Sequence, residues 1–261
     1  MQAAFVLSPT TTSLRAGLRF GDRSTHTSRT MMLAELTELL RALPTSTDRE
    51  SYLTAIVEGN ALGKSTESSR RLTSQRLGEL YGLDPKLAIF RALRRVWSAD
   101  EPGRPLSALL CALARDPLLR ATSEVVLSLP EGAELGRTSL LATLRAAVGE
   151  RLNEAVLDKV ARNVASTWCQ AGHLVGRVRK VRRRVQASAG PLALALWLGS
   201  LEGLGGEELL RSRWARVLDR SPRELETIAL RAKQLGLIQA RIGGGVTEID
   251  ASGLADEGMQ G

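Results

Sequence analysis

Aromatic side chains are scarce in this sequence of 261 residues, at 3% of the total. An apolar core must therefore be built mainly from Leu, Val and Ala, which favours packed helices. The scarcity also argues against a surface on which single-stranded bases stack. The two Cys and two His residues are widely separated in the chain, and they are too few for a structural zinc site. We therefore expect neither a metal nor a cofactor.

Long apolar runs are also missing. The longest covers residues 191–198, far fewer than the ~18 residues that a membrane-spanning helix requires. Residues 1–30 are rich in Ser, Thr and Arg and lack the long apolar core of a secretory signal. We therefore expect a soluble, cytoplasmic protein with no membrane partner, in which residues 1–30 form a weakly ordered arm.

Acidic residues are absent from a long stretch in the second half of the chain. No Asp or Glu occurs between Asp158 and Glu202, and the eight bases in this interval equal the whole formal net charge of +8. These bases are Lys159, Arg162, Arg177, Arg179, Lys180, Arg182, Arg183 and Arg184. Such a concentration of charge is typical of a surface that binds a polyanion. Arginine suits phosphate because its guanidinium group can donate two hydrogen bonds at once.

Apolar residues recur with helical periodicity along most of the chain. The fold class that we expect is mainly α: a multi-helix bundle with helix-turn-helix or winged-helix-like modules and small β-hairpins. Residues 31–150 are predicted to form a helical N-terminal domain. Residues 151–250 are predicted to form a helical C-terminal domain with winged-helix-like elements, and residues 251–261 a flexible tail.

Several helix N-termini can be predicted from capping residues. The pairs in question are Thr47 with Glu50, Asp84 with Pro85, Asp116 with Pro117, and Ser221-Pro222 with Glu224. A capping side chain accepts a hydrogen bond from a free backbone N–H, and proline fits the first helical position. We expect a helix to begin at each pair, including one over residues 118–128.

Two further helices are expected to end at glycine and to pass directly into a strand. Residues 172–178 and 236–242 share the pattern Gly-x-(Leu/Ile)-x-x-Arg-(Val/Ile). Glycine is favoured at a helix end because it adopts the left-handed conformation without strain. Strands are expected at 174–178 and 238–242, and the second turns through three glycines into a partner strand at 246–249. A helix that leads into a hairpin in this way is typical of a winged-helix module.

The first candidate site is the basic tract, which we define as residues 177–184. On a wing or loop its bases would meet adjacent phosphates and release counterions. The candidate DNA contacts are Arg177, Arg179, Lys180, Arg182, Arg183 and Arg184. His173, at the end of the preceding helix, is a further candidate because it can reach phosphate there. The alternative is a solvated face whose bases pair with acids elsewhere in the fold. We favour nucleic acid because the neighbouring sequence offers no acid.

The second candidate site is the start of the helix after Gly63, where hydroxyl groups and bases gather. Its residues are Lys64, Thr66, Ser68, Ser69, Arg70, Arg71 and Arg76. Backbone N–H groups at a helix start also meet phosphate, and the alternative is an ordinary Ser/Thr cap on an exposed helix. A phosphate-binding loop is excluded because only three residues, not four, separate Gly59 from Gly63. Nothing in the sequence has the spacing of a catalytic site, so we expect a protein that is not an enzyme.

Two groups of short motifs carry a family resemblance. The pattern Asn60-x-x-x-Lys64-x-Thr66-x-Ser68-Ser69-Arg70-Arg71, followed by Leu77-x-x-Leu80-Tyr81, resembles the N-terminal region of the BrxA proteins of bacteriophage-exclusion (BREX) defence systems. The motif Lys159-x-x-Arg162-Asn163, the helix ending in Gly172-His173-Leu174 and the basic strand after it are similar to that family's C-terminal half. The Ser/Thr-rich start and the helix–hairpin after Ser221 depart from the family pattern.

The resemblance implies a small helical component that binds double-stranded DNA without catalysis, beside larger enzymes of the defence system. Lys64, Thr66, Ser69, Arg70 and Arg71 would then belong to an N-terminal helix-turn-helix-like surface. Arg177, Arg179 and Lys180 would belong to a C-terminal one. Other defence-system proteins are therefore possible partners alongside DNA.

The hypothesis that follows is a non-catalytic, double-stranded-DNA-binding component of a BREX-like phage-defence system, which binds mainly through phosphate contacts. One alternative is a protein-interaction adaptor whose arginines dock on an acidic partner in a defence complex. Another is an RNA-binding factor of the antitermination type. The DNA sequence preference and the oligomeric state are left open.

Overall fold

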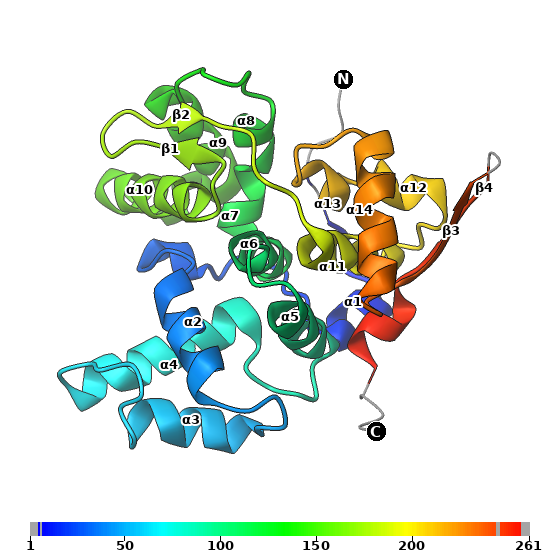
Figure 1. Cartoon of the computed structure of the whole chain (residues 1–261). Helices are drawn as coiled ribbons and strands as arrows, with labels where there is room; N and C mark the ends of the chain where they lie inside the picture. Colours follow the sequence, from blue (N-terminus) through cyan, green and yellow to red (C-terminus); the bar gives the residue numbers. More distant parts are fainter. Residues whose placement is uncertain (1–4, 6, 244–245, 257–261) are drawn as a thin grey trace.

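The structure is a computed structural model that describes residues 5, 7–243 and 246–256. It is mainly helical, with two small antiparallel hairpins (Figure 1), and this confirms the expected fold class. In chain order the α-helices are α1 (Thr11–Ala16), α2 (Leu33–Ala42), α3 (Arg49–Val57), α4 (Glu67–Tyr81), α5 (Ala88–Ala99), α6 (Arg104–Arg115), α7 (Pro117–Ala121), α8 (Ser123–Leu127), α9 (Arg137–Val148), α10 (Glu154–Gln170), α11 (Ala189–Ser200), α12 (Glu207–Leu210), α13 (Arg213–Arg216) and α14 (Pro222–Gln234). The short 3₁₀ helices are η1 (Thr25–Thr27), η2 (Gly149–Arg151) and η3 (Ser252–Ala255).

The core is organised around α6 and α11, which are buried on nearly every side. A helix that is apolar all round is suited to the centre of a protein and not to its surface. α11 packs against α5, α6, α13 and α14, and α6 also contacts α4 and α10. One continuous apolar cluster therefore crosses residue 150, where we had expected a boundary between two domains.

The ends of the described chain pack against this core, which differs from the expected weakly ordered arm and flexible tail. The Phe5 ring meets the Trp214 ring edge-on, with centroids 4.9 Å apart, and Ala16 and Leu18 are buried. At the other end, η3 packs against α5 and α11, and its Leu254 is fully buried. Residues 1–4 and 257–261 of the two expected segments lie outside the described residues.

The predicted helix starts at Asp116 and Ser221 are confirmed by side-chain caps on α7 and α14. The other two are wrong. Asp48, not Thr47, caps α3: the Asp48 carboxylate accepts from Ser51 N at 2.7 Å, and the Thr47 hydroxyl donates to the Pro44 carbonyl. The Asp84 carboxylate accepts from Lys86 N in a turn, so α5 begins only at Ala88. The helix expected over residues 118–128 is broken at Thr122 into α7 and α8.

Both predicted helix-to-hairpin segments form. α10 ends before Gly172 (φ 90°) and leads into β1 (Leu174–Val175), which pairs with β2 (Val181–Arg182). α14 ends before Gly236 (φ 68°) and leads into β3 (Gln239–Gly243), which pairs with β4 (Val246–Asp250). β1 covers only residues 174–175 of the strand expected at 174–178. Within the described residues, none of the helices combines the length and the apolar character needed to cross a membrane.

Candidate nucleic-acid interface

The β1–β2 hairpin projects part of the basic tract away from the body of the protein (Figure 1). Gly176 opens its turn at φ 103°, and a Cβ atom there would lie 2.1 Å from the Arg179 carbonyl oxygen, so only glycine fits. Val178, at the tip, has 90% of its surface exposed. On its other edge β2 is joined to residues 132–135: Leu135 N donates to Lys180 O at 2.7 Å, and Arg182 N donates to Ala133 O at 2.8 Å. The short hairpin is thereby anchored to the loop before α9.

Five bases of the tract lie toward solvent but differ in their partners. Arg177 and Arg183 are exposed, and their side chains make no hydrogen bond or ion pair among the described residues. The Lys180 ammonium donates to Gly176 O at 2.8 Å, and this hydrogen bond closes the turn. Because the acceptor is a neutral carbonyl, the Lys180 charge is not compensated by it. Arg179 is 78% exposed but pairs with Glu134 at 2.8 Å. Arg184 is exposed and donates to Asp219 O at 2.8 Å.

Arg182 is wrongly predicted as a DNA contact. Its side chain is 4% exposed, and its guanidinium donates to the Val126 carbonyl at 3.0 Å and to the Asp219 carboxylate at 2.5 Å. The side chain faces inward because Arg182 pairs with buried Leu174 in the hairpin and shares its face. The expectation that no acid neutralises the tract also fails, since Glu134 and Asp219 come from distant segments.

His173 is likewise wrongly predicted as a DNA contact, because its ring is fully buried. Its Nε2 lies 2.8 Å from the Val217 carbonyl oxygen, and the ring meets the Trp168 ring edge-on at 4.9 Å. Burial lowers the pKa of His173 to about 4, against a smaller opposing effect of the Asp219 charge. A neutral imidazole that donates Nε2–H to a carbonyl ties β1 to the 217–219 loop. Its role is structural.

The second predicted site, at the start of α4, is largely neutralised within the protein. Lys64 pairs with Glu35 at 3.0 Å, Arg71 with Glu67 at 2.6 Å and Arg76 with Glu79 at 2.7 Å. The Thr66 and Ser69 hydroxyls form a capping box at the start of the helix. These two residues therefore fit the alternative of an ordinary Ser/Thr cap. Ser68 is exposed and Arg70 is half-buried, with its Nε atom buried and without a partner.

The two predicted sites do not come together. Figure 1 shows α4 and the β1–β2 hairpin at opposite ends of the molecule, with α2 and α10 between them. A single short duplex contact spanning both is therefore not built into the fold.

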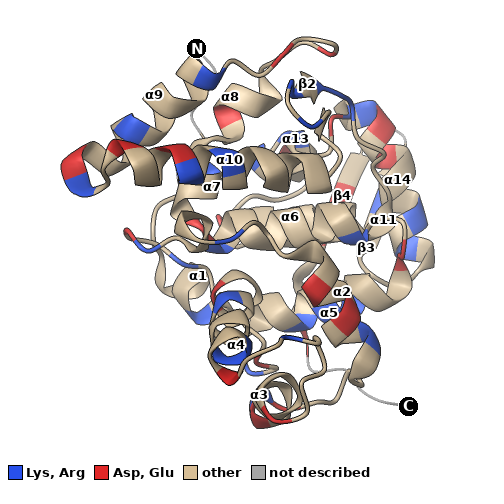
Figure 2. Ribbon diagram, turned by 90° about the vertical axis from the view of Figure 1, so that its left-hand side faces the viewer, with Lys and Arg blue, Asp and Glu red and all other residues tan. Residues whose placement is uncertain are grey.

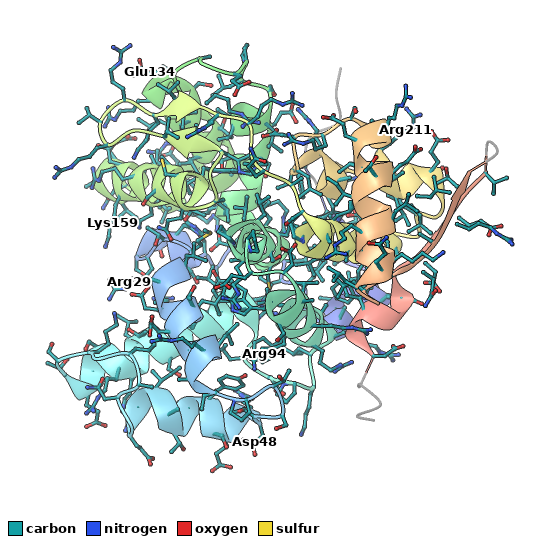
Figure 3. All side chains as sticks on the ribbon, in the orientation of Figure 1. Arg29, Asp48, Arg94, Glu134, Lys159 and Arg211 are labelled. Atoms are coloured by element: carbon teal, nitrogen blue, oxygen red, sulfur yellow. The ribbon has the colours of Figure 1, made fainter. Side chains whose placement is uncertain are left out.

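The structure instead places other bases near the hairpin. Lys159 and Arg162 lie on the exposed side of α10, without partners among the described residues. Arg29 is also exposed and unpaired, and Figure 3 shows it on the same flank as Lys159. The segment that carries Arg29 is fixed against α10 because the Asn163 amide donates to His26 O at 2.8 Å.

We define the α10–hairpin surface as Arg29, Lys159, Arg162, Arg177 and Arg183. Figure 2 faces this side and shows basic residues along α10, in the segment beneath it and in the β2 region. The surface ends near the start of α10, where acids are paired with bases: Asp158 with Arg137 at 2.7 Å, and Glu154 with Arg145. Lys159 and Arg162 belong to the acid-free stretch of the sequence, although neither is among the predicted DNA contacts. Arg29 had no comparable signal.

A buried set of polar residues has the order of a hydrolase triad. His26 Nδ1 lies 3.0 Å from the Asp116 carboxylate, and His26 Nε2 lies 2.9 Å from the Thr167 hydroxyl. Burial would raise the pKa of Asp116, but His26 and the hydrogen bonds to Asp116 outweigh it and lower the pKa to about 2. All three side chains are buried, so a substrate cannot reach the hydroxyl. Thr167 also accepts from Met31 N at 2.9 Å, and the set joins η1 to α7 and α10.

The described residues contain no group of three or more His, Cys, Asp or Glu side chains placed to hold a metal ion. Compared with models of known protein families, the chain matches none, and a search of curated proteins finds no significant match.

Proposed function

We propose that the protein is a non-catalytic binder of double-stranded DNA that contacts backbone phosphates through the α10–hairpin surface. The observation that carries this proposal is the set of five bases on one side of the molecule that have no acidic partner in the described structure. Unpaired, exposed guanidinium and ammonium groups can release counterions from a polyanion without first breaking an internal ion pair. Bases that are already paired with acids, such as those around α4, contribute less binding free energy to a phosphate contact.

The contact would be tolerant of sequence. All five residues of this surface are Lys or Arg, which suit phosphate, and phosphate contacts carry no sequence information directly. A setting in a BREX-like defence system rests only on the resemblance of the short motifs. It is a proposal of its own, and neighbouring genes for a methyltransferase and a large ATPase would support it.

The test is a mobility-shift titration of a duplex over a range of salt concentrations, with a matched pair of triple variants. In the first, Lys159, Arg162 and Arg177 are replaced with Ala. In the second, Arg49, Lys86 and Lys233, which are exposed bases without partners elsewhere on the protein, are replaced with Ala. The two variants have the same net charge and differ only in where the charge is lost.

The first variant should bind all duplex sequences more weakly, and its slope of log affinity against log salt should be shallower by about 3, at ~0.9 per phosphate contact. The second should behave like the unmodified protein. An unmodified protein that fails to bind duplex at low salt, or binds with a flat salt response, would contradict the proposal. Preferential competition by structured RNA would support the antitermination alternative. A nuclease-resistant protein partner that is lost only in the first variant would support the adaptor.

A further inference from the structure

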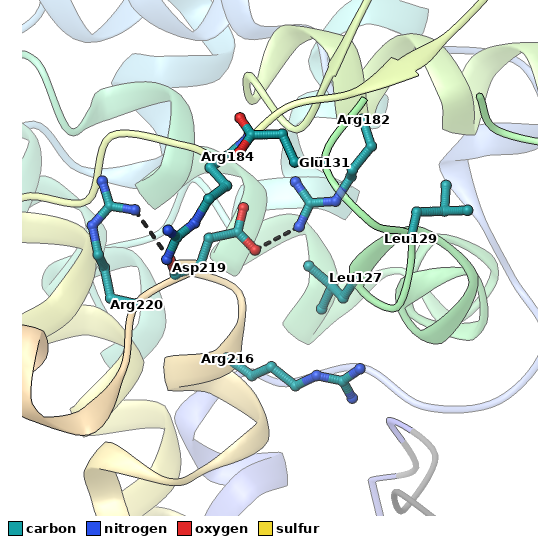
Figure 4. Close-up of a pocket in the computed structure, with 8 residues that line it drawn as sticks. All are labelled: Leu127, Leu129, Glu131, Arg182, Arg184, Arg216, Asp219 and Arg220. Carbon is teal, nitrogen blue, oxygen red and sulfur yellow. Dashed lines mark hydrogen bonds and ion pairs between the residues drawn. The ribbon is translucent and has the colours of Figure 1, made fainter. Parts of the chain in front are cut away.

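A pocket with a cavity volume of about 380 Å³ lies between the end of α8, the chain leaving the β1–β2 hairpin and the loop that precedes α14. One wall comes from the end of α8 and the loop after it, a second from the chain leaving β2, and a third from the 216–220 loop before α14. Figure 4 shows Arg184 and Arg220 beside Asp219, with Leu127 and Leu129 across the pocket. Its size is within the range of small-molecule sites, and it is separate from the α10–hairpin surface.

Four arginines line the pocket, but two of them are already saturated. Arg182 is buried against the Asp219 carboxylate and three carbonyl groups, and both terminal nitrogens of Arg216 donate to Glu124, at 2.7 and 3.1 Å. Arg184 and Arg220 differ, because their guanidinium groups donate to one shared acceptor, the Asp219 carbonyl oxygen, at 2.8 and 3.1 Å. Two like charges meet at a neutral oxygen there, and an anion bound between them would relieve their repulsion.

The nearby acids only partly offset these two charges. The Asp219 carboxylate is engaged by Arg182 and by Val185 N, and Glu224 lies 3.9 Å from Arg220 while also accepting from Ser221. Glu131 accepts only the backbone N–H of Arg184, at 3.3 Å, so its charge opposes an incoming anion. Asp219 adopts φ 53°, a left-handed conformation that Asp tolerates better than most non-glycine residues.

We propose that this pocket binds the phosphate of an organic phosphomonoester, with Arg184 and Arg220 as the donors. Guanidinium groups match phosphate because they present paired N–H donors. Leu127 and Leu129 supply an apolar wall for the organic group, which inorganic phosphate lacks. The source is either a free nucleotide or the 5′-phosphate end of a nucleic acid strand. This inference does not depend on the proposed duplex binding.

The test is calorimetry with inorganic phosphate, a nucleoside 5′-monophosphate, and a short single strand with either a 5′-phosphate or a 5′-hydroxyl. The monophosphate should bind more tightly than inorganic phosphate. Replacement of Arg184 and Arg220 with Ala should weaken binding by about tenfold or more, from the loss of charge-assisted hydrogen bonds. Binding of the strand only when it is 5′-phosphorylated would identify the strand end as the source, and binding of the mononucleotide alone would identify the free nucleotide.

A misfolded variant without Arg184 and Arg220 would also lose binding, so Glu131→Gln provides a second test. It should strengthen binding by roughly threefold through loss of a repulsive charge. The variant lacking Lys159, Arg162 and Arg177 should bind the monophosphate normally, so failure of the duplex proposal remains distinguishable. The pocket proposal is overturned if no phosphate probe binds at millimolar concentration, or if binding is the same with and without Arg184 and Arg220.

Discussion

The two helix-to-hairpin units have the same local backbone pattern and opposite surface character. In both, the residue after the helix-ending glycine donates its N–H five residues back: His173 to Trp168 O and Leu237 to Ala232 O, each at 3.0 Å. This hydrogen bond and a glycine of positive φ end a helix in the Schellman manner and redirect the chain. Each chain then forms an antiparallel hairpin.

The hairpins themselves differ. β1 and β2 have two residues each, and this hairpin is held by backbone hydrogen bonds to residues 132–135 and by the buried Arg182–Asp219 pair. β3 and β4 have five residues each, so backbone hydrogen bonds carry that hairpin. The first presents unpaired Arg177 and Arg183, whereas the second sets Arg241 opposite Glu248, 4.0 Å apart. Glycine and apolar spacing therefore determine the path of the chain, and the charged positions independently determine what it can bind.

The largest expected difference between the hairpins concerns the buried ion pair. Asp219→Asn preserves the left-handed backbone, which Asn tolerates, but leaves the Arg182 charge buried without its partner. Breaking such a pair by removing one charge should lower the free energy of unfolding by about 3 kcal/mol. Denaturant titration followed by circular dichroism measures this loss.

The matched control is Glu248→Gln in the second hairpin. Arg241 and Glu248 are 84% and 67% exposed, and exposed pairs contribute little to stability. We expect no measurable change in the unfolding free energy. Equal effects of the two substitutions would mean that the first hairpin does not depend on its buried pair.

The second difference is the residue that follows each glycine, His173 in one unit and Leu237 in the other. Because burial lowers the pKa of His173 to about 4, the unfolded chain takes up a proton at this position below its ordinary value of about 6.5, while the folded protein does not. The stability of the protein should therefore fall as the pH decreases from 6.5 to 4, by about 3 kcal/mol from this residue.

His173→Leu gives the first unit the residue of the second and tests that dependence. At pH 7 the variant should be less stable by about 1–2 kcal/mol, since the Val217 carbonyl loses its donor. The gap should then close or reverse toward pH 4, because the variant has no imidazole to protonate. Unfolding free energies measured for both proteins at several pH values give this difference directly. A constant gap from pH 7 to pH 4 would show that the folded protein binds the proton as readily as the unfolded chain.

The features that could be predicted from the sequence are local in the chain. The Asp116 and Ser221 side chains accept hydrogen bonds from backbone N–H groups only three residues further along the chain. The helix ends at Gly172 and Gly236 likewise depend on neighbouring residues only. Helical periodicity likewise indicated the mainly α fold, because amphipathic helices such as α5 and α14 each have their own apolar side. The two wrong helix starts also depend on local hydrogen bonds: the cap of α3 is Asp48 and not its neighbour Thr47, and the Asp84 carboxylate accepts from Lys86 N in a turn before α5.

The features that could not be predicted join distant residues. Arg182 meets Asp219 across 37 positions, Arg179 meets Glu134 across 45, and His26 meets Asp116 across 90. An acid-free stretch of sequence therefore did not ensure an unpaired surface, and a Ser/Thr-rich start did not ensure disorder. The arginine-lined pocket had no sequence signal, because its walls come from three separate segments.

The smallest expected effect concerns Arg177 and Arg241, which occupy equivalent positions in the shared pattern. Arg177 has no partner among the described residues, whereas Arg241 lies opposite Glu248. Arg177→Ala should weaken duplex binding by roughly fivefold at 0.1 M salt and reduce the salt slope by ~0.9, while Arg241→Ala should leave both unchanged. Each variant removes one exposed positive charge, so net charge alone predicts equal losses. Mobility-shift titrations of the two proteins at several salt concentrations separate these expectations, and equal losses would indicate that general electrostatic attraction, not the first hairpin, holds the DNA.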